Sequence, residues 1–296
     1  MNPNDPKPHS SVEPVQLGLE DRFRFRCHRD IPCFNACCKN IDILLTPYDL
    51  LRLKRRLGLT SRALIDAHTR DFTLDAHGMP GLKLATKPGT QECVFLTPEG
   101  CGIYEDRPAA CRYYALGLLS LRKTGSPDDE DSYFVVKEDH CLGHFEPHEQ
   151  NVADYRTEQG LPPYDDANRE WRRIILKKRS AGPTIGTPSS RSFELFFLAS
   201  YDLEGFLAFV TSPGFQELFE LEPDFLQQLC DQEEIRLQFA LRFLRQVLFG
   251  EHTIPLREAA VQGRRARYRE KVQHIEEEAR RLREAGEDLS VEDFEE

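Results

Sequence analysis

The chain has little that points to membranes, leader sequences or nucleic acid. No run of eighteen or more apolar residues occurs, so a membrane-spanning helix is not expected. Residues 1–16, MNPNDPKPHSSVEPVQ, lack the basic and apolar segments of a signal peptide. The formal net charge is −11, whereas binding to a phosphate backbone needs an excess of cations. We therefore expect a cytoplasmic protein with no membrane span and no nucleic-acid partner.

Sequence motifs of several enzyme classes are absent as well. There is no C-x3-C-x2-C radical motif and no glycine-rich nucleotide loop after a strand-like segment. No serine lies in a G-x-S-x-G context, so a hydrolase triad has no support. The sequence therefore assigns no catalytic residue and leaves open whether the protein is an enzyme.

Cysteine is the residue type that the chain does have in an unusual arrangement. Four of the nine cysteines fall within the twelve residues from 27 to 38, spaced C-x5-C-x3-C-C, and a second group follows as C-x7-C-x9-C. In a reducing compartment such clusters indicate metal ligands or redox groups more than structural disulfides. The candidate ligands, which exclude only Cys230, are Cys27, Cys33, Cys37, Cys38, Cys93, Cys101, Cys111 and Cys141.

Thiolates are ligands of soft metals, so the cluster predicts zinc or an iron–sulfur centre. Eight cysteines suffice for one four-ligand site with spares or for two complete sites. Adjacent side chains point different ways in most backbone conformations. We therefore expect that Cys37 and Cys38 serve two sites, or that one of them is not a ligand. The alternative for an individual cysteine is a buried thiol or a strained vicinal disulfide.

Histidines and cations beside the cysteines are further candidates. His144 follows Cys141 in a C-x2-H half-site and could complete a mixed ligand set. Four thiolates on zinc, or on an oxidised 4Fe–4S core, leave about two net negative charges, which nearby cations would stabilise. Arg107 and Arg112 bracket Cys111 in R-P-x-x-C-R. For these two residues we weigh a role beside the metal against ordinary surface charge.

These residues resemble a known family. The adjacent cysteines followed by ILLTPYDLLRL, and then CGIYEDRPAACRYY, are similar to the YkgJ-type cysteine-cluster proteins, a family of zinc- or iron-chelating domains. The resemblance covers about residues 23–145, although the family more often spaces its first cysteines closer than C-x5-C. The metal-binding positions that it implies are Cys33, Cys37, Cys38, Cys93, Cys101 and Cys111.

Three functions are compatible with the cysteines. The first is a metal-binding protein that carries an iron–sulfur cluster, 4Fe–4S in type, or zinc, with C-terminal helices that support it or contact a protein partner. The second is an enzyme that uses the cluster for redox chemistry or S-adenosylmethionine-dependent methyl transfer. Its methyl-transfer form rests on the resemblance, because a related domain occurs in flagellin lysine methylases. The third is a structural zinc module in an interaction protein.

Composition and periodicity predict an α+β, mainly α, fold. A small cysteine-rich domain with short strands, organised by its metal, precedes a helical domain. The first residues are rich in Pro, Ser and Asn and cannot recover the entropy of ordering by burial. The predicted segments are a disordered tail at 1–20, a metal-binding domain at 21–160, a connecting helix and linker at 161–190, a helical domain at 191–285 and an acidic tail at 286–296.

Helix signals are clear after the first cysteines. Thr46 and Pro47 predict a helix start, because Thr caps the first turn and Pro lacks only an N–H that would be unpaired. Gly58 predicts the end of that helix, and Thr60 predicts the start of another.

Other elements are predicted by pattern alone. Short apolar runs predict a hairpin of 81–85 with 92–96 and another of 116–122 with 133–137. The last helix, about 256–285, carries apolar residues at alternating steps of four and three. We expect this seam to pack on its own bundle, because two heptads are short for a coiled coil.

Overall fold

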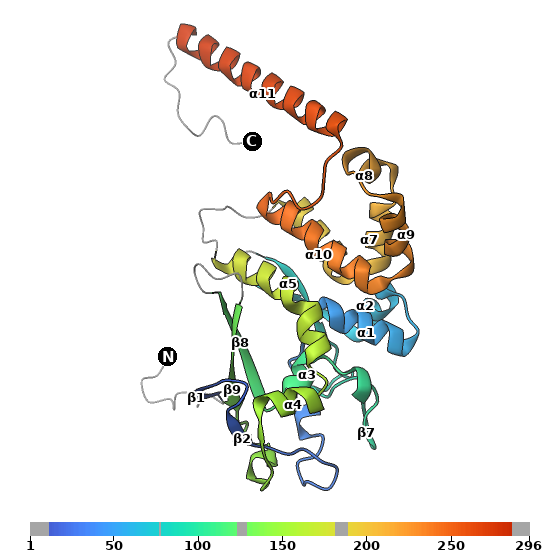
Figure 1. Cartoon of the computed structure of the whole chain (residues 1–296), viewed down its shortest axis with the longest axis vertical. Helices are drawn as coiled ribbons and strands as arrows, with labels where there is room; N and C mark the ends of the chain where they lie inside the picture. Colours follow the sequence, from blue (N-terminus) through green and yellow to red (C-terminus); the bar gives the residue numbers. More distant parts are fainter. Residues whose placement is uncertain (1–11, 77, 123–128, 181–188, 286–296) are drawn as a thin grey trace.

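The computed structural model describes residues 12–76, 78–122, 129–180 and 189–285. In these ranges the chain is mainly helical, and its strands all precede the first long series of helices. Figure 1 shows the strands in the lower part of an elongated molecule, with most of the helices above them. The prediction of an α+β, mainly α, fold with strands first and helices after is confirmed.

The strands of the described residues form small antiparallel sheets. Their orders are β1–β9–β8, β10–β2, β3–β5–β4 and β6–β7. None is wide enough to make a core by itself, so each depends on helices or loops packed against it. The bounds are β1 (Val12–Leu17), β2 (Arg22–Arg24), β3 (Leu44–Leu45), β4 (Thr69–Thr73), β5 (Pro80–Leu84), β6 (Leu96–Thr97), β7 (Gly100–Cys101), β8 (Leu116–Arg122), β9 (Asp129–Val136) and β10 (Glu149–Asn151).

The helices include three short 3-10 turns, η1 (Ala36–Cys38), η2 (Tyr104–Asp106) and η3 (Gly143–Phe145). Among the described residues, no helix is both long enough and apolar enough to cross a membrane. The α-helices are α1 (Pro47–Leu57), α2 (Ser61–His68), α3 (Ala109–Tyr113), α4 (Val152–Glu158), α5 (Pro162–Ser180), α6 (Ser190–Tyr201), α7 (Leu203–Val210), α8 (Pro213–Leu218), α9 (Pro223–Asp231), α10 (Glu233–Phe249) and α11 (Glu258–Ala285).

Helices α1 and α2 begin where their sequence signals place them. The Thr46 hydroxyl accepts a hydrogen bond from the Asp49 N–H at 3.2 Å, and the Asp49 carboxylate accepts one from the Thr46 N–H at 2.8 Å. Gly58 ends α1 at φ 65°, a conformation that residues with a side chain rarely adopt. Thr60 caps α2 by accepting from the Ala63 N–H at 3.2 Å. These local predictions are confirmed.

One of the two predicted hairpins is confirmed, and the other is confirmed only near its turn. β8 and β9 pair antiparallel along the whole of β8. Most of the segment 81–85 does not pair with 92–96, because β3 and β4 occupy the two edges of β5. The chain pairs just after β5, through the antiparallel bridge between Thr86 and Cys93 and the hydrogen bonds from the Lys87 N–H to the Glu92 carbonyl at 2.8 Å and from the Val94 N–H to the Ala85 carbonyl at 3.3 Å.

Strand β1 corrects part of the predicted tail. Residues 12–17 pair antiparallel with β9, with Gln16 opposite Phe134. Val12 and Val15 are exposed and Leu17 is only partly buried, so hydrogen bonding to the edge of β9 holds the strand with little burial of its apolar side chains. A polar composition therefore did not exclude an ordered strand here, because an edge strand needs no core of its own.

The domain boundaries stay a prediction. Three segments of that division, residues 1–11, 181–188 and 286–296, lie outside the described residues. Where the chain is described, one hydrophobic cluster, the main core, contains buried residues from before position 104 and from after position 195. Helix α1 contacts α5, α6 and α10 within it.

A smaller cluster, the second core, lies among β2, the β8–β9 hairpin and α4. Phe23 packs edge-on against Tyr155, with ring centroids 5.3 Å apart. The two cores meet near α3. The buried members of the second core are Phe23, Phe25, Tyr113, Ala115, Leu116, Tyr133, Val135, Cys141, Val152, Tyr155 and Leu161.

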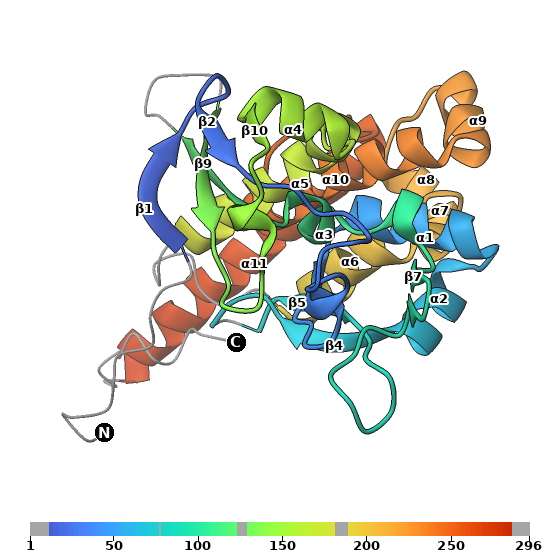
Figure 2. The ribbon, with the colours of Figure 1, turned by 90° about the horizontal axis from the view of Figure 1, so that it is seen from below.

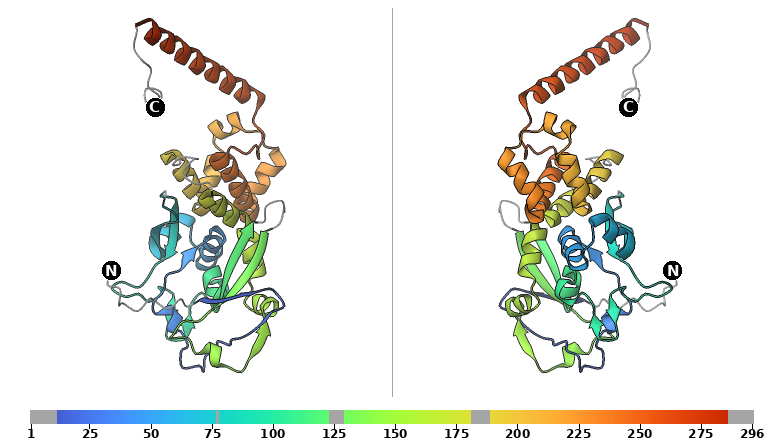
Figure 3. Two further views of the ribbon diagram at one scale, coloured as in Figure 1. Left: turned by 90° about the vertical axis from the view of Figure 1, so that its left-hand side faces the viewer. Right: turned by 90° about the vertical axis from the view of Figure 1, so that its right-hand side faces the viewer.

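Helix α11 projects from the rest of the molecule, as Figures 1 and 3 show. It contacts α8, but Tyr268 is 70% exposed and Ile275 is 37% exposed. The prediction that its apolar seam packs on its own bundle is wrong for the described side chains. The helix is mostly charged, so docking the seam would bury little apolar area. A protein partner for the C-terminal helices stays a prediction.

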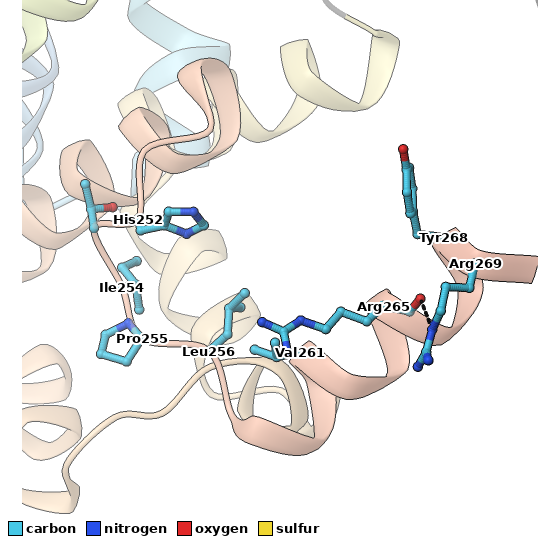
Figure 4. Close-up of a pocket in the computed structure, with 9 residues that line it drawn as sticks. His252, Ile254, Pro255, Leu256, Val261, Arg265, Tyr268 and Arg269 are labelled. Atoms are coloured by element: carbon cyan, nitrogen blue, oxygen red, sulfur yellow. Dashed lines mark hydrogen bonds between the residues drawn. The ribbon is translucent and has the colours of Figure 1, made fainter. Parts of the chain in front are cut away.

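A broad pocket of about 960 Å³ lies where α11 leaves the bundle. Figure 4 shows Arg265 reaching from α11 back toward Leu256 and Val261, while Tyr268 extends away from them. The loop that follows α10 forms the other wall, beginning at His252. No cysteine lines this pocket, so it is separate from the residues that the sequence singles out.

Buried Lys54 joins α1 to the helical part of the chain. Its side chain is 6% exposed and its ammonium pairs with Glu204 at the start of α7 and with Glu233 at the start of α10. Replacing it leaves these carboxylates without their shared cation. We expect Lys54→Ala to lower the free energy of unfolding in urea by about 2 kcal/mol. The matched control is Arg191→Ala, whose exposed pair with Glu194 should contribute less than about 0.5 kcal/mol. Equal losses in the two variants would contradict this prediction.

The same ion pair predicts a dependence of stability on pH. Burial acts to raise the pKa of Glu204, but hydrogen bonds from Lys54 and the Ser61 N–H outweigh it and lower the pKa to about 2. A carboxyl whose pKa is lowered in the folded state stabilises the protein above its ordinary pKa, and this contribution is lost as the pH falls toward 2. The stability difference between the wild type and Glu204→Gln should therefore shrink from pH 5 to pH 3. A difference independent of pH, measured by urea unfolding, would contradict this.

Candidate metal centre

The segment between β2 and β3, which holds the first four cysteines, passes close to the loop that holds Cys141. In Figure 2, which views the molecule from below, the segment between β2 and β3 crosses α3 toward β4 and β5. The Arg26 N–H donates to the Gly143 carbonyl at 3.1 Å. A Cβ on Gly143 would lie 2.7 Å from the Phe25 ring and 2.9 Å from the Arg26 carbonyl oxygen, so this approach requires glycine. The contact carries Cys27 to the loop that holds Cys141.

Four thiols line one small pocket at this crossing. The Leu142 N–H donates to the Cys33 sulfur at 3.2 Å, which holds the loop after β9 against the first cysteine segment. Tyr114 and His140 line the same pocket, and the Tyr114 hydroxyl donates to Glu138 at 2.6 Å. The thiols of this pocket are named the outer group: Cys27, Cys33, Cys37 and Cys141.

The turn η1 sends the two adjacent cysteines in different directions. Asn35 precedes the turn at φ 64°, in the left-handed region that Asn tolerates better than most residues. Successive residues of a 3-10 turn are rotated by about 120° around its axis. Cys37 accordingly lines the outer pocket and Cys38 does not. Their sulfur atoms lie 4.0 Å apart.

The remaining thiols gather on the side of η1 that faces the main core. The Cys93 N–H donates to the Cys38 carbonyl at 2.8 Å, and Cys101 lies in the β6–β7 pair opposite Leu96. Helix α3 carries Cys111. Cys93 belongs to the main core, and Cys38 and Cys101 pack against it. We name these thiols the inner group: Cys38, Cys93, Cys101 and Cys111.

Backbone N–H groups donate to several of these sulfurs. These N–H groups belong to residues two or three positions after the cysteine. Such bonds favour the thiolate and lower the thiol pKa, although burial is the larger effect and leaves each pKa raised. The pairs are Cys93 with Phe95 and Leu96, Cys101 with Ile103, and Cys141 with Gly143.

Crowding favours the protonated thiols. Cys27 is exposed, yet it is surrounded closely enough that burial, followed by the neighbouring Cys37 and Cys33, raises its pKa to about 11. The hydrogen bond between the adjacent cysteines lowers the pKa of Cys37 and raises that of Cys38. Burial raises the pKa of Cys111 above the ordinary range. A metal must displace these protons, so metal affinity should increase with pH.

Arg107 is buried, and its charge acts on one thiol of each group. Its guanidinium donates to the Tyr104 carbonyl at 2.8 Å and to the Gln159 side chain at 2.6 Å. Its charge lowers the pKa of Cys27 and of Cys101, although burial dominates both. The surface-charge alternative for Arg107 is therefore wrong, and its position suits a cation that offsets the charge of thiolates.

Arg112 is also buried, but it braces the fold. It donates to the Arg107 carbonyl at 3.0 Å, to the Gln159 carbonyl at 2.7 Å and to the Tyr164 hydroxyl at 3.2 Å. Its guanidinium carbon lies 4.3 Å from the centre of the Tyr164 ring. These contacts tie α3 to the junction of α4 and α5, so surface charge is the wrong interpretation for Arg112 as well.

The structure does not bring His144 to the thiols. Its Nε2 atom lies 3.0 Å from the Val136 carbonyl oxygen, and its ring packs against Phe25. Tyr114 lines the pocket of the outer group, although the sequence analysis did not identify it as a functional residue. The one sequence feature that could have indicated it is its position three residues after Cys111.

The thiols are neighbours in the structure and do not form a closed coordination shell. Within residues 12–285, apart from the gaps at 77, 123–128 and 181–188, no three His, Cys, Asp or Glu side chains are placed to hold a metal ion. The chemistry of the donor set fits a soft metal, because the groups consist of thiols with N–H donors at their sulfurs and a buried cation beside them. All nine cysteines are free thiols.

A comparison with protein families agrees with this chemistry. Residues 26–142 match the family CxxCxxCC, described as "Putative zinc- or iron-chelating domain". The match confirms the resemblance drawn from the sequence, and all eight cysteines of the two groups lie within it. It covers less than half of the chain, and the C-terminal helices lie outside it. No curated protein and no solved structure matches the chain.

The position of Arg107 predicts the reactivity of a thiol. Replacing it by glutamine removes the charge that favours the Cys27 thiolate, so the alkylation rate of Cys27 by iodoacetamide at pH 8 should fall on the order of threefold in metal-free protein. Peptide mass spectrometry measures this rate. Arg107→Lys keeps the charge and should restore most of the rate, and Arg29→Gln, an exposed neighbour in sequence, should leave it unchanged. An unchanged rate in Arg107→Gln, with circular dichroism like that of the wild type, would contradict the prediction.

Proposed function

We propose that the domain at residues 26–142, which matches a family of zinc- or iron-chelating domains, carries an iron–sulfur cluster on its cysteine thiolates. The cluster is 4Fe–4S in type, and zinc is the alternative metal. The observation that carries the proposal is the convergence of thiols from distant segments around η1 without a disulfide among them. N–H groups that act on the thiol sulfurs, as at Cys93 and Cys101, would stabilise metal-bound thiolates and support the proposal.

The kind of donor supports iron–sulfur over zinc. The proposed ligands are all cysteines, and iron–sulfur clusters are held by sets of four thiolates. Zinc sites also use four cysteines but often include histidine, and His144 is turned toward the Val136 carbonyl. Nine free thiols also suit a reducing compartment, which supports the cytoplasm as the location that we propose.

The proposal assigns no reaction. A cluster could transfer electrons or support methyl transfer, and both enzyme hypotheses stay predictions. The structural zinc module also stays a prediction. What the proposed cluster supplies is a metal core whose charge and potential respond to the hydrogen bonds and cations around the sulfurs, such as Arg107 and the Leu142 N–H.

Metal analysis of anaerobically purified protein tests the proposal. We expect brown protein with broad absorption near 400 nm and with iron and acid-labile sulfide in equal amounts, at least about four of each per chain. The control is Cys230→Ser, because Cys230 is exposed on α9 outside the family match. This variant should retain the full metal content. Colourless protein that holds only zinc would overturn the iron–sulfur proposal, and protein that binds neither metal would overturn metal binding by these thiols.

A further inference from the structure

We infer that the eight thiols form two separate metal centres that divide at the Cys37–Cys38 peptide bond. The outer group makes an exchangeable centre, and the inner group makes a centre that holds the fold together. This inference rests on the proposed function, because it assigns different roles to the same proposed ligands. It goes beyond that function by fixing how the ligands are shared and which centre can be emptied without unfolding.

The outer centre is defined by a shared pocket. Cys37 lines it together with the other three thiols of the outer group, whereas Cys38 and the rest of the inner group do not. The Leu142 N–H bond to Cys33 and the Arg26 N–H bond to the Gly143 carbonyl connect the two chain segments that supply these thiols. The outer group therefore has its own walls and its own backbone connections.

The inner centre is defined by the main core. Cys93 is buried in that core, and Cys38 and Cys101 pack against it, whereas Cys141 belongs to the second core. The Cys93 N–H bond to the Cys38 carbonyl fixes the second cysteine segment on this side of η1. Thus the cysteines that belong to or pack against a hydrophobic cluster divide in the same way as the two groups: Cys38, Cys93 and Cys101 lie at the main core, and Cys141 lies in the second core.

The geometry of η1 explains why adjacent cysteines can serve different centres. A rotation of about 120° between successive residues lets the Cys37 thiol line the outer pocket while the Cys38 thiol packs against the main core. With Cys37 on one side and Cys38 on the other, each group contains four thiols, the number that completes either a tetrahedral zinc site or an iron–sulfur cluster. A single centre at η1 would leave four of the crowded thiols without a metal.

Exposure separates the roles of the two centres. Cys27 and Cys37 are exposed, and both belong to the outer group, whereas no cysteine of the inner group is exposed. A chelator or oxidant in solution can therefore reach the outer sulfurs first. Loss of the inner metal would leave thiols unsatisfied beside the main core, because Cys93 is 7% exposed and lies among its side chains.

Paired double variants test the division. Cys33→Ala with Cys141→Ala removes two outer ligands, and Cys93→Ala with Cys101→Ala removes two inner ligands. After anaerobic reconstitution we expect about eight iron atoms per wild-type chain and about four in the outer double variant, because each cluster holds four. The outer variant should keep wild-type circular dichroism and protease resistance, and the inner variant should lose both. Cys230→Ala is the control that should change neither quantity.

A kinetic measurement on the wild type keeps the inference testable even where the inner variant does not fold. Release of iron to an excess of a coloured chelator should occur in two phases of equal amplitude, the slower at least about tenfold slower. The outer double variant should lack the fast phase. A single phase in the wild type would overturn the inference, and so would an outer variant that loses all of its metal or none of it.

The outcomes also separate this inference from the proposal on which it rests. Full iron content in the wild type with complete loss in the outer variant would overturn the two centres and leave the iron–sulfur proposal standing. Two zinc ions in the wild type falling to one in the outer variant would support two centres while overturning iron–sulfur. A wild type that binds no metal would overturn both.

Discussion

Eight thiols crowd around the three-residue turn η1. The arrangement on both sides of the turn depends on the free-energy cost of ionising these thiols close to one another. A thiolate in such surroundings is costly, so the pKa of Cys27 and that of Cys111 are raised and the thiols hold their protons. A metal replaces those protons with a cation that the sulfurs share. Protonation, metal binding and folding of residues 26–142 are therefore linked, and Arg107 and the N–H donors lower the cost of forming thiolates.

Only interactions that are local in the chain could be predicted from the sequence. Thr46 and Gly58 determine the ends of α1, because their hydrogen bonds join residues three or four positions apart. The partners of β5 are not encoded in this way, since its edges are filled by β3, from a distant part of the chain, and by β4, whose sequence TRDFT has no apolar run. Strand β1 was not predicted for a related reason. It is stabilised by pairing with the edge of β9, and its Val15 side chain remains exposed, so its own sequence gives no pattern of burial.

The candidate ligands follow from residue type and clustering, but their grouping needs the fold. The different directions of the Cys37 and Cys38 side chains could be predicted from the sequence, because they depend on the geometry of one peptide unit. The contact between Cys33 and the loop at Leu142 could not be predicted from the sequence. These residues are 109 positions apart, and they meet through the close approach that Gly143 allows. For the same reason His144, which sits beside a ligand candidate in sequence, faces the Val136 carbonyl in space.

Helix α3 connects the inner group to the helical part of the protein. The Ala109 N–H at its start donates to Asp49 at 2.8 Å, and Asp49 is fully buried in α1, where burial raises its pKa to about 6. At its other end Arg112 holds Tyr164 of α5. Cys111 lies between these two attachments, and both α1 and α5 contact α10. A metal at the proposed inner centre that moved α3 would therefore strain buried polar contacts on two helices of the main core, and this would connect the proposed centre to the packing of the C-terminal helices.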